Sequence, residues 1–312
     1  MELNAKASNG DLGAMSELNE IRRFAMEPVL MKEIKLLSIY GNYKAIGFND
    51  SCEVEIPEFA NIDPKIQAAG QDVTFPVIRK KRVPIATVNI SGGYAVDYRK
   101  AAVGDMTDEN ELQDQVRVQI RNKATKYVVE TIYNAIKNAK GVKYFAEDAG
   151  LTKTNVDKVI TNVRRFGKPT ITGDYAFISQ FNAFAGYIGT TPTVNGISQK
   201  VMDEIHDTGL MGMYNGSVLS ELPNPYDLTT INKDGDNFET ILPAGLGYVI
   251  PAGGQSPIYT VTRGGLTSFT GTDVTTGQIM SRFDLSVGAL VAPNREYEIG
   301  LIHDKNLDSL TV

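Results

Sequence analysis

The chain has 312 residues, of which 42% are hydrophobic and 22% are charged, and this is the balance of an ordinary globular protein with a sizeable core. The formal net charge of −6 disfavours a nucleic-acid-binding protein, because contacts with phosphate require a positive field. Cys52 is the only cysteine, which excludes an intramolecular disulfide and a multi-cysteine zinc site and agrees with folding in a reducing cytoplasm.

Neither a signal peptide nor a membrane-spanning segment is expected from the sequence. The first residues are polar, and no long apolar run follows them. The most apolar early stretch, residues 29–40, contains Lys32, Glu33 and Lys35. A membrane span needs about 20 uninterrupted apolar residues, so no contact with a membrane is expected.

The first 49 residues are predicted to form an N-terminal arm with little core of its own. Asn9, Gly10, Asp11 and Gly13 interrupt the chain before a short helix over residues 16–26, and Pro28 limits its continuation.

Residues 50–104 are predicted to form an extended β arm. Four prolines punctuate the segment, and proline is confined to the edges of sheets because it cannot donate a backbone hydrogen bond; they are Pro57, Pro64, Pro76 and Pro84. Apolar residues alternate with others at Val73, Phe75 and Val77, and again at Tyr94, Val96 and Tyr98. Two strands that run out and back explain this pattern.

The clearest element is a long helix over residues 107–140. Thr107 and Asp108 supply an N-cap, and Gly141 allows a left-handed stop. Apolar residues recur at steps of three or four along one stripe: Leu112, Val116, Ile120, Ala124, Val128, Ile132, Ile136 and Ala139. At a rise of about 1.5 Å per residue, this helix is long enough to act as a spine for other elements.

The remaining chain is predicted to mix helices and strands, so the fold class is α+β. Helices are expected over residues 155–166, after Asp174 and after Ser198, and a short strand is expected at 170–171. From residue 213 onward glycine-rich turns separate strands, the last of which are expected at 278–283, 286–291 and 297–302.

Three local motifs and the order of these segments resemble the major capsid proteins of tailed bacteriophages with the Hong Kong 97-type fold. The motifs are KPTITGDY from Lys168, SELPNPYD from Ser220 and REYEIGLIHD from Arg295. The resemblance covers nearly the whole chain. It implies an N-terminal arm (1–49), an extended loop (50–104), a peripheral domain with a spine helix (105–169 and 284–312) and an axial domain (170–283).

The same resemblance implies a structural subunit that self-assembles into hexamers and pentamers of an icosahedral capsid. Such a shell encloses double-stranded DNA without sequence-specific binding, is assembled in the bacterial cytoplasm and becomes part of the virion. Portal, scaffolding or decoration proteins are possible partners, and no cofactor or metal is implied. An encapsulin-like bacterial compartment, which encloses enzymes, shares the fold and remains the alternative.

The predicted contacts between subunits lie in the extended loop. A long arm with few internal contacts must pack on something else, because ordering its backbone costs about 1–2 kcal/mol per residue. The predicted contact residues are Phe75, Val77, Arg79, Lys80, Lys81, Arg82, Val83 and Ile85. The basic run 79–82 has three interpretations: pairing with acidic residues of a neighbour, a solvated edge strand that deters aggregation, or contact with nucleic acid.

An enzyme is the rival class, a hydrolase in particular, and the sequence offers it little. Only His206 and His303 could serve as catalytic bases, and Cys52 lacks a recognisable catalytic context. Gly245-Leu-Gly247 lacks the third glycine of a dinucleotide-binding loop. The acidic run at residues 234–237 is better explained as a tight turn than as a calcium loop. No catalytic role is therefore expected.

Overall fold

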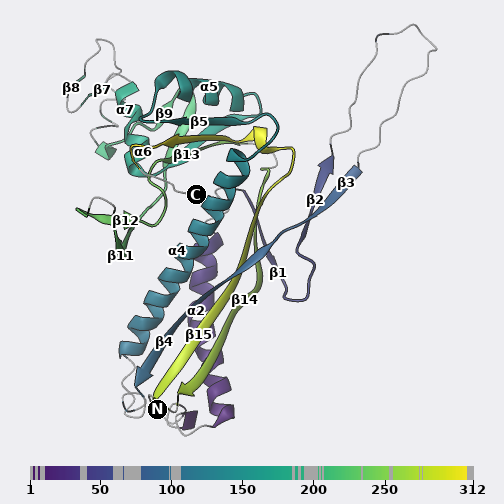
Figure 1. Cartoon of the computed structure of the whole chain (residues 1–312), viewed down its shortest axis with the longest axis vertical. Coiled ribbons are helices and arrows are strands. Elements are labelled where there is room, and N and C mark those ends of the chain that lie inside the picture. The colour runs from purple at the N-terminus through teal and green to yellow at the C-terminus, as the bar shows by residue number, and fades with distance from the viewer. Residues whose placement is uncertain are drawn as a thin grey trace.

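A long body and a more compact upper unit make up this computed structural model (Figure 1). Apart from isolated residues and two two-residue strands, the structure describes residues 11–35, 41–58, 79–97, 107–184, 207–232, 235–252, 256–273 and 277–307. The helices are α2 (Leu12–Lys35), α4 (Thr107–Lys137), α5 (Lys153–Val163), α6 (Tyr175–Ser179), α7 (Phe181–Phe184) and a short 3-10 turn (Glu296–Glu298). The strands are β1 (Asn42–Ile46), β2 (Glu53–Glu58), β3 (Arg79–Pro84), β4 (Thr87–Asp97), β5 (Tyr144–Asp148), β6 (Lys168–Gly173), β7 (Tyr187–Ile188), β8 (Thr191–Pro192), β9 (Met213–Tyr214), β10 (Ser217–Glu221), β11 (Tyr226–Ile231), β12 (Phe238–Thr240), β13 (Leu246–Ala252), β14 (Ile258–Asp273), β15 (Gln278–Val291) and β16 (Gly300–Asp304).

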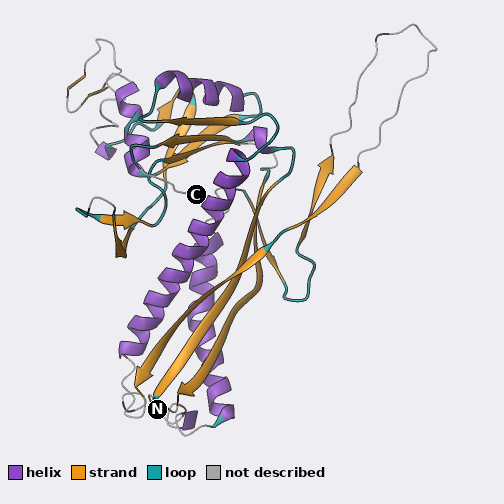
Figure 2. Ribbon diagram, viewed as in Figure 1, coloured by secondary structure: helices purple, strands orange, loops and turns teal. Residues whose placement is uncertain are grey.

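The long body is a four-stranded sheet with two helices along one face (Figure 2). Its strand order is β1-β14-β15-β4, in which β1 runs parallel to β14 and the other pairs are antiparallel. Tyr94 and Val96 of β4 and Phe283 and Leu285 of β15 point into the core between sheet and helices. The alternation predicted at Tyr94 and Val96 is confirmed, and their strand pairs with β15; the segment around residue 75, the other half of the expected pair, lies outside the described residues.

Helix α4 confirms the predicted spine. It spans 31 residues, and its stripe is fully buried at Ala124, Val128, Ile132 and Ile136. Burying each of the larger aliphatic side chains contributes about 1.5–3 kcal/mol. Near its carboxyl end, α4 also contacts the upper unit, where the Tyr248 hydroxyl donates to the carbonyl of Val129 at 3.2 Å. One helix therefore links both parts of the fold.

Helix α2, which lies within the expected N-terminal arm, packs on the core of its own chain. Pro28 lies inside this 24-residue helix, although the sequence predicted that proline would limit it. An interior proline costs about 3 kcal/mol. Met26, Leu30 and Ile34 are all buried in the main core on either side of it, and their burial offsets that loss.

The upper unit is built on a six-stranded sheet with the order β5-β16-β13-β6-β10-β9. The amphipathic helix α5 covers it with Val156, Val159, Ile160 and Val163, as the sequence predicted. Phe166, predicted on the same apolar face, lies beyond the end of the helix and is 42% exposed. Asp174 caps helix α6, and its carboxylate accepts a hydrogen bond from the backbone N–H of Ala176 at 2.7 Å.

The sheets divide the chain differently from the expected domain bounds. Strand β5 and helix α5 were expected in the peripheral domain, yet both belong to the upper unit, and so does the closing strand β16. The expected axial domain also included β14 and the start of β15. Both strands lie in the sheet of the long body. Residues 278–291 form one strand and not two. Pairing between distant strands decides these bounds, and local patterns do not reveal it.

Candidate assembly surface

Strands β2 and β3 form an antiparallel hairpin that projects from the long body (Figure 1). The hairpin joins an acidic strand, EVEIPE, to a basic strand, RKKRVP. Pro57 and Pro84 lie in it without breaking a larger sheet, because both strands are at an edge. The predicted contact residues Phe75 and Val77 lie outside the described residues.

Two of the four cations in the basic run are paired within the chain. Lys80 Nζ lies 3.4 Å from Glu55 Oε2, and Arg82 Nε lies 3.2 Å from Glu55 Oε1. The hydrogen bond from Lys80, followed by that from Arg82, holds the pKa of the Glu55 carboxyl below its ordinary value. All three side chains are exposed, so water screens these pairs and they add little to stability.

The other two cations point to the opposite face of the hairpin. The side chains of Arg79 and Lys81 are exposed, and no other described residue forms a hydrogen bond or ion pair with either side chain. Val83 follows them on the same face and is partly buried. Ile85, also predicted as a contact residue, is only 5% exposed in the single chain and packs with Ile46 and Val261.

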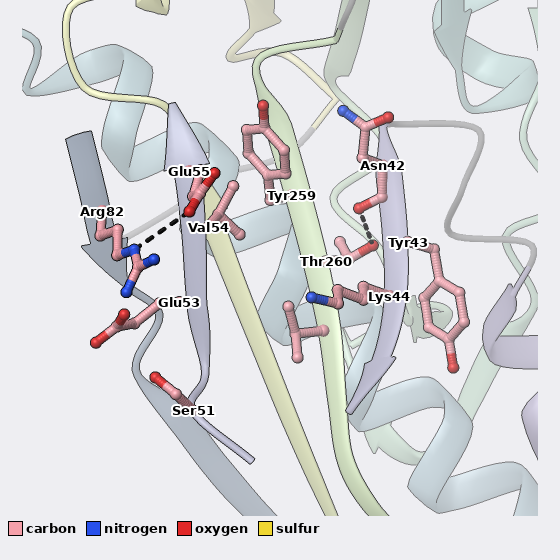
Figure 3. Close-up of a pocket in the computed structure, with 11 residues that line it drawn as sticks. Asn42, Tyr43, Lys44, Ser51, Glu53, Val54, Glu55, Arg82, Tyr259 and Thr260 are labelled. Atoms are coloured by element: carbon pink, nitrogen blue, oxygen red, sulfur yellow. Dashed lines mark hydrogen bonds and ion pairs between the residues drawn. The ribbon is translucent and has the colours of Figure 1, made fainter. Parts of the chain in front are cut away.

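A cleft of about 610 Å³ lies between the hairpin and the sheet (Figure 3). Glu53 and Arg82 contribute one wall, Lys44 of β1 contributes the other, and Tyr259 and Thr260 of β14 form the floor. Charges of both signs and an aromatic ring line this open cleft. It suits a protein surface better than it suits a small apolar ligand.

A buried polar cluster fastens α2 to the long body. Arg22 of α2 forms an ion pair with Glu109 of α4, and each is less than 10% exposed. The Tyr94 hydroxyl donates to Glu109 at 3.1 Å, and Arg22 Nη1 donates to the hydroxyls of Thr270 and Ser281, each at 3.0 Å. Burial raises the pKa of Tyr94 to about 12. The cluster joins α2 and α4 to strands β4, β14 and β15.

Two further polar features that the sequence singled out, His303 and the turn around residue 235, lie within the described residues. His303 is buried on β16, where its Nδ1 lies 3.1 Å from Glu147 Oε1 and its ring packs edge-on against Tyr133. His206 lies outside the described residues. Around residue 235, the Asn232 side chain accepts from three consecutive backbone N–H groups, which makes the expected tight turn.

Within the described residues, no three potential metal ligands come together. The helices of that same part of the chain include none whose length and apolar character would suffice to span a membrane.

Comparison with known proteins identifies the family of this chain. A family described as "SPbeta prophage-derived putative capsid protein YonB" matches residues 2–303 of the chain. The chain belongs to this family. It is therefore a structural, shell-forming subunit of a phage capsid. No curated protein matches its sequence.

Solved structures show that this capsid subunit has the Hong Kong 97-type fold, as the sequence indicated. The capsid protein of cyanophage P-SCSP1u superimposes with a TM-score of 0.55 at 11% identity, covering 86% of this chain and 87% of that one. The head of Helicobacter pylori bacteriophage KHP40 gives 0.53 at 12% identity, covering 85% and 88%. The SrpI encapsulin of Synechococcus elongatus PCC 7942 gives 0.52 at 11% identity, covering 88% of each chain.

The sequence located the basic strand of the capsid subunit but missed the partners of its residues. Glu55 was not recognised as the carboxylate that binds Lys80 and Arg82. The signal was present, since an acidic strand precedes a basic strand of equal length. Arg22 and Glu109 were not connected either, because 87 positions of sequence separate them and no local pattern joins them.

Proposed function

We propose that this capsid subunit assembles into hexamers and pentamers of an icosahedral shell that encloses double-stranded DNA. Membership of a prophage capsid family and the Hong Kong 97-type fold support the proposal. The net charge of −6 fits enclosure of DNA without specific binding, because an acidic subunit does not neutralise phosphate broadly. We assign it no catalytic role.

The single observation that carries the assembly proposal is the projecting hairpin. Strands β2 and β3 pair with each other and with no other described strand. Two strands alone are marginally stable in water, so the hairpin gains most from packing on another surface. Arg79 and Lys81 are exposed cations with no partner among the described residues, and we propose that acidic residues of a neighbouring copy bind them.

The proposed domain roles follow the sheets. The long body with α4, α2 and β1-β14-β15-β4 corresponds to the peripheral domain, and β2–β3 to the extended loop. The unit around β5-β16-β13-β6-β10-β9 corresponds to the axial domain, whose copies would meet at the symmetry axes. This division follows the strand pairing, so it replaces the bounds expected from the sequence.

Assembly in the bacterial host cytoplasm, and contacts with portal, scaffolding or decoration proteins, belong to the same proposal. An encapsulin-like compartment is the second candidate, and the likeness to the SrpI encapsulin supports it at the level of the fold. The family's prophage description favours the phage capsid. Terminase and portal genes beside this one, in place of a gene for an enclosed enzyme, would distinguish them.

Electron microscopy of the expressed protein tests the proposal. The wild-type chain is expected to form closed particles of uniform size, whereas a variant with Arg79, Lys80, Lys81 and Arg82 all replaced by alanine is expected to remain unassembled with an unchanged circular dichroism spectrum. A matched control replaces four exposed cations of the upper unit and keeps assembly: Lys153, Lys158, Arg165 and Lys168. Monomeric wild-type protein under all assembly conditions would contradict the shell proposal itself.

A further inference from the structure

Helix α2 has two apolar faces, and its own chain covers only one of them. The covered face packs on the core of the long body. The second face is exposed and carries apolar residues at the spacing i, i+3, i+4, i+7 and i+8, which places them side by side on a helix; they are Ile21, Phe24, Ala25, Pro28 and Val29. A helix with two apolar faces is expected to bury both, so this face needs a partner.

The largest side chains of this exposed face remain open to water. Phe24 is 62% exposed, Ile21 is 55% exposed and Val29 is 44% exposed. The guanidinium of Arg23 lies 5.1 Å from the centre of the Phe24 ring, but Arg23 also pairs with Glu27 and covers only one side of the ring. Burial of these side chains on a partner would therefore remove substantial apolar surface from water.

The charges at the two ends of the face are opposite in sign. Glu17 and Glu20 precede the apolar residues, and Lys32 follows them. All three side chains are exposed, and none forms an ion pair with another described residue. A second α2 helix that runs antiparallel would place Lys32 beside the two glutamates of its partner at both ends. A parallel helix would place like charges together, so the charge order favours the antiparallel arrangement.

The residue at the centre of the face is small. Ala25 lies midway between Ile21 and Val29, so an antiparallel pair centred on Ala25 would place Ile21 of each copy against Val29 of the other. The small side chain lets the two helices approach to the usual interaxial distance of about 8–10 Å. The face is therefore complementary to itself around a two-fold axis, which is the property of an isologous contact.

We infer that the exposed face of α2 binds the same face of a second copy of this chain, antiparallel and around a two-fold axis. The inference rests on the proposed shell function and adds a contact to it. Neighbours within a ring of five or six subunits meet through two different surfaces, so a two-fold contact joins subunits of adjacent rings. Five side chains form a small interface beside the about 1,200–2,000 Å² of a stable complex. The contact is therefore expected in particles and not between free subunits.

Disulfide trapping in particles tests the contact directly. In a Cys52→Ser background, which removes the only natural thiol, Ala25→Cys is expected to give covalent dimers on a non-reducing gel after oxidation of particles assembled from this chain alone. Such particles contain no scaffolding protein, so a dimer identifies a second copy as the occupant. Leu12→Cys is the matched control, because it is 81% exposed on the same helix but would lie about 40 Å from its counterpart.

The outcomes separate this contact from the shell function. Well-formed Ala25→Cys particles that yield only monomers would overturn the inference and leave the shell function intact, and so would equal crosslinking at positions 25 and 12. A wild-type chain that never assembles would instead refute the shell function.

Exchange of the end charges tests the direction of the two helices. Lys32→Glu alone and Glu17→Lys with Glu20→Lys are each expected to lower the yield of particles several-fold, because each places like charges together across the two-fold axis. Combining all three changes is expected to restore the yield. Urea unfolding of free subunits checks that each variant folds, since these exposed charges contribute little to stability. Absence of rescue in variants that fold would exclude the antiparallel pairing.

Discussion

Replacing Arg22 with methionine should destabilise the subunit strongly, because it leaves the Glu109 carboxylate buried without its cation. Glu109 is 3% exposed, and of the described residues only Tyr94, whose hydroxyl lies at 3.1 Å, would still donate to it. Removing one partner of a buried ion pair costs about 3–5 kcal/mol. Methionine keeps most of the apolar stem of the arginine, so the loss reports the charge and not a cavity.

The same position offers two matched variants. Adding Glu109→Gln to Arg22→Met removes the stranded charge and should recover more than half of the lost stability. Arg23→Met, one residue along, removes a half-exposed ion pair with Glu27 at 3.7 Å and should cost less than about 1 kcal/mol.

Urea unfolding of the unassembled subunits measures these free energies from the midpoint and slope of each transition. A loss below about 1 kcal/mol for Arg22→Met would refute the reasoning. A double variant no more stable than Arg22→Met would do so as well, because the stranded charge would then not explain the loss.

Three further changes test the body of the fold. Gly247→Ala would place a Cβ atom 2.1 Å from Phe177 Cε1, so it should lower the free energy of unfolding in urea by at least about 1–3 kcal/mol. Gly271→Ala, where no atom lies within 4 Å of the added Cβ atom, should be tolerated. Ile132→Ala removes a fully buried side chain of α4 and should lower the unfolding free energy by about 2–5 kcal/mol. Burial raises the pKa of the Tyr94 hydroxyl from 10.0 to about 12, so the unfolded chain loses this proton at a lower pH than the folded chain. The stability that the neutral hydroxyl provides below pH 10 is therefore lost as the pH rises toward 12. Tyr94→Phe should therefore flatten the decline in unfolding free energy over that interval.

Local patterns predicted the helices of this chain well where one face is buried. The stripe of α4 recurs over many turns, and the burial of Val128, Ile132 and Ile136 reproduces it. Helix α2 was underestimated because Pro28 is a strong local signal for termination. The opposing contribution comes from Leu30 and Ile34, which bury themselves against distant residues, and a local pattern does not report distant contacts.

Strand pairing and burial within the extended segment were less accessible to sequence reasoning. Residues 79–85 were treated as one contact surface, yet Ile85 is a core residue and Lys80 and Arg82 are bound to Glu55. Alternation along a strand identifies its two faces but not the element that each face meets. The pairing of β16 was hidden for the same reason, because its partners β13 and β5 are distant in sequence.

Side chains and strand edges that have partners within the chain should affect folding of the subunit. Those that lack partners among the described residues should affect assembly. The Arg22 cluster and the α4 stripe are closed within one chain, so substitutions there should act on the stability of each subunit. The exposed apolar face of α2 and the cations Arg79 and Lys81 lack partners among the described residues, so substitutions there should spare the monomer and act on the shell. A surface cation without a partner contributes little to folding. Repeated in every copy of a closed shell, the same cation can contribute at each contact, and its effect on assembly is multiplied.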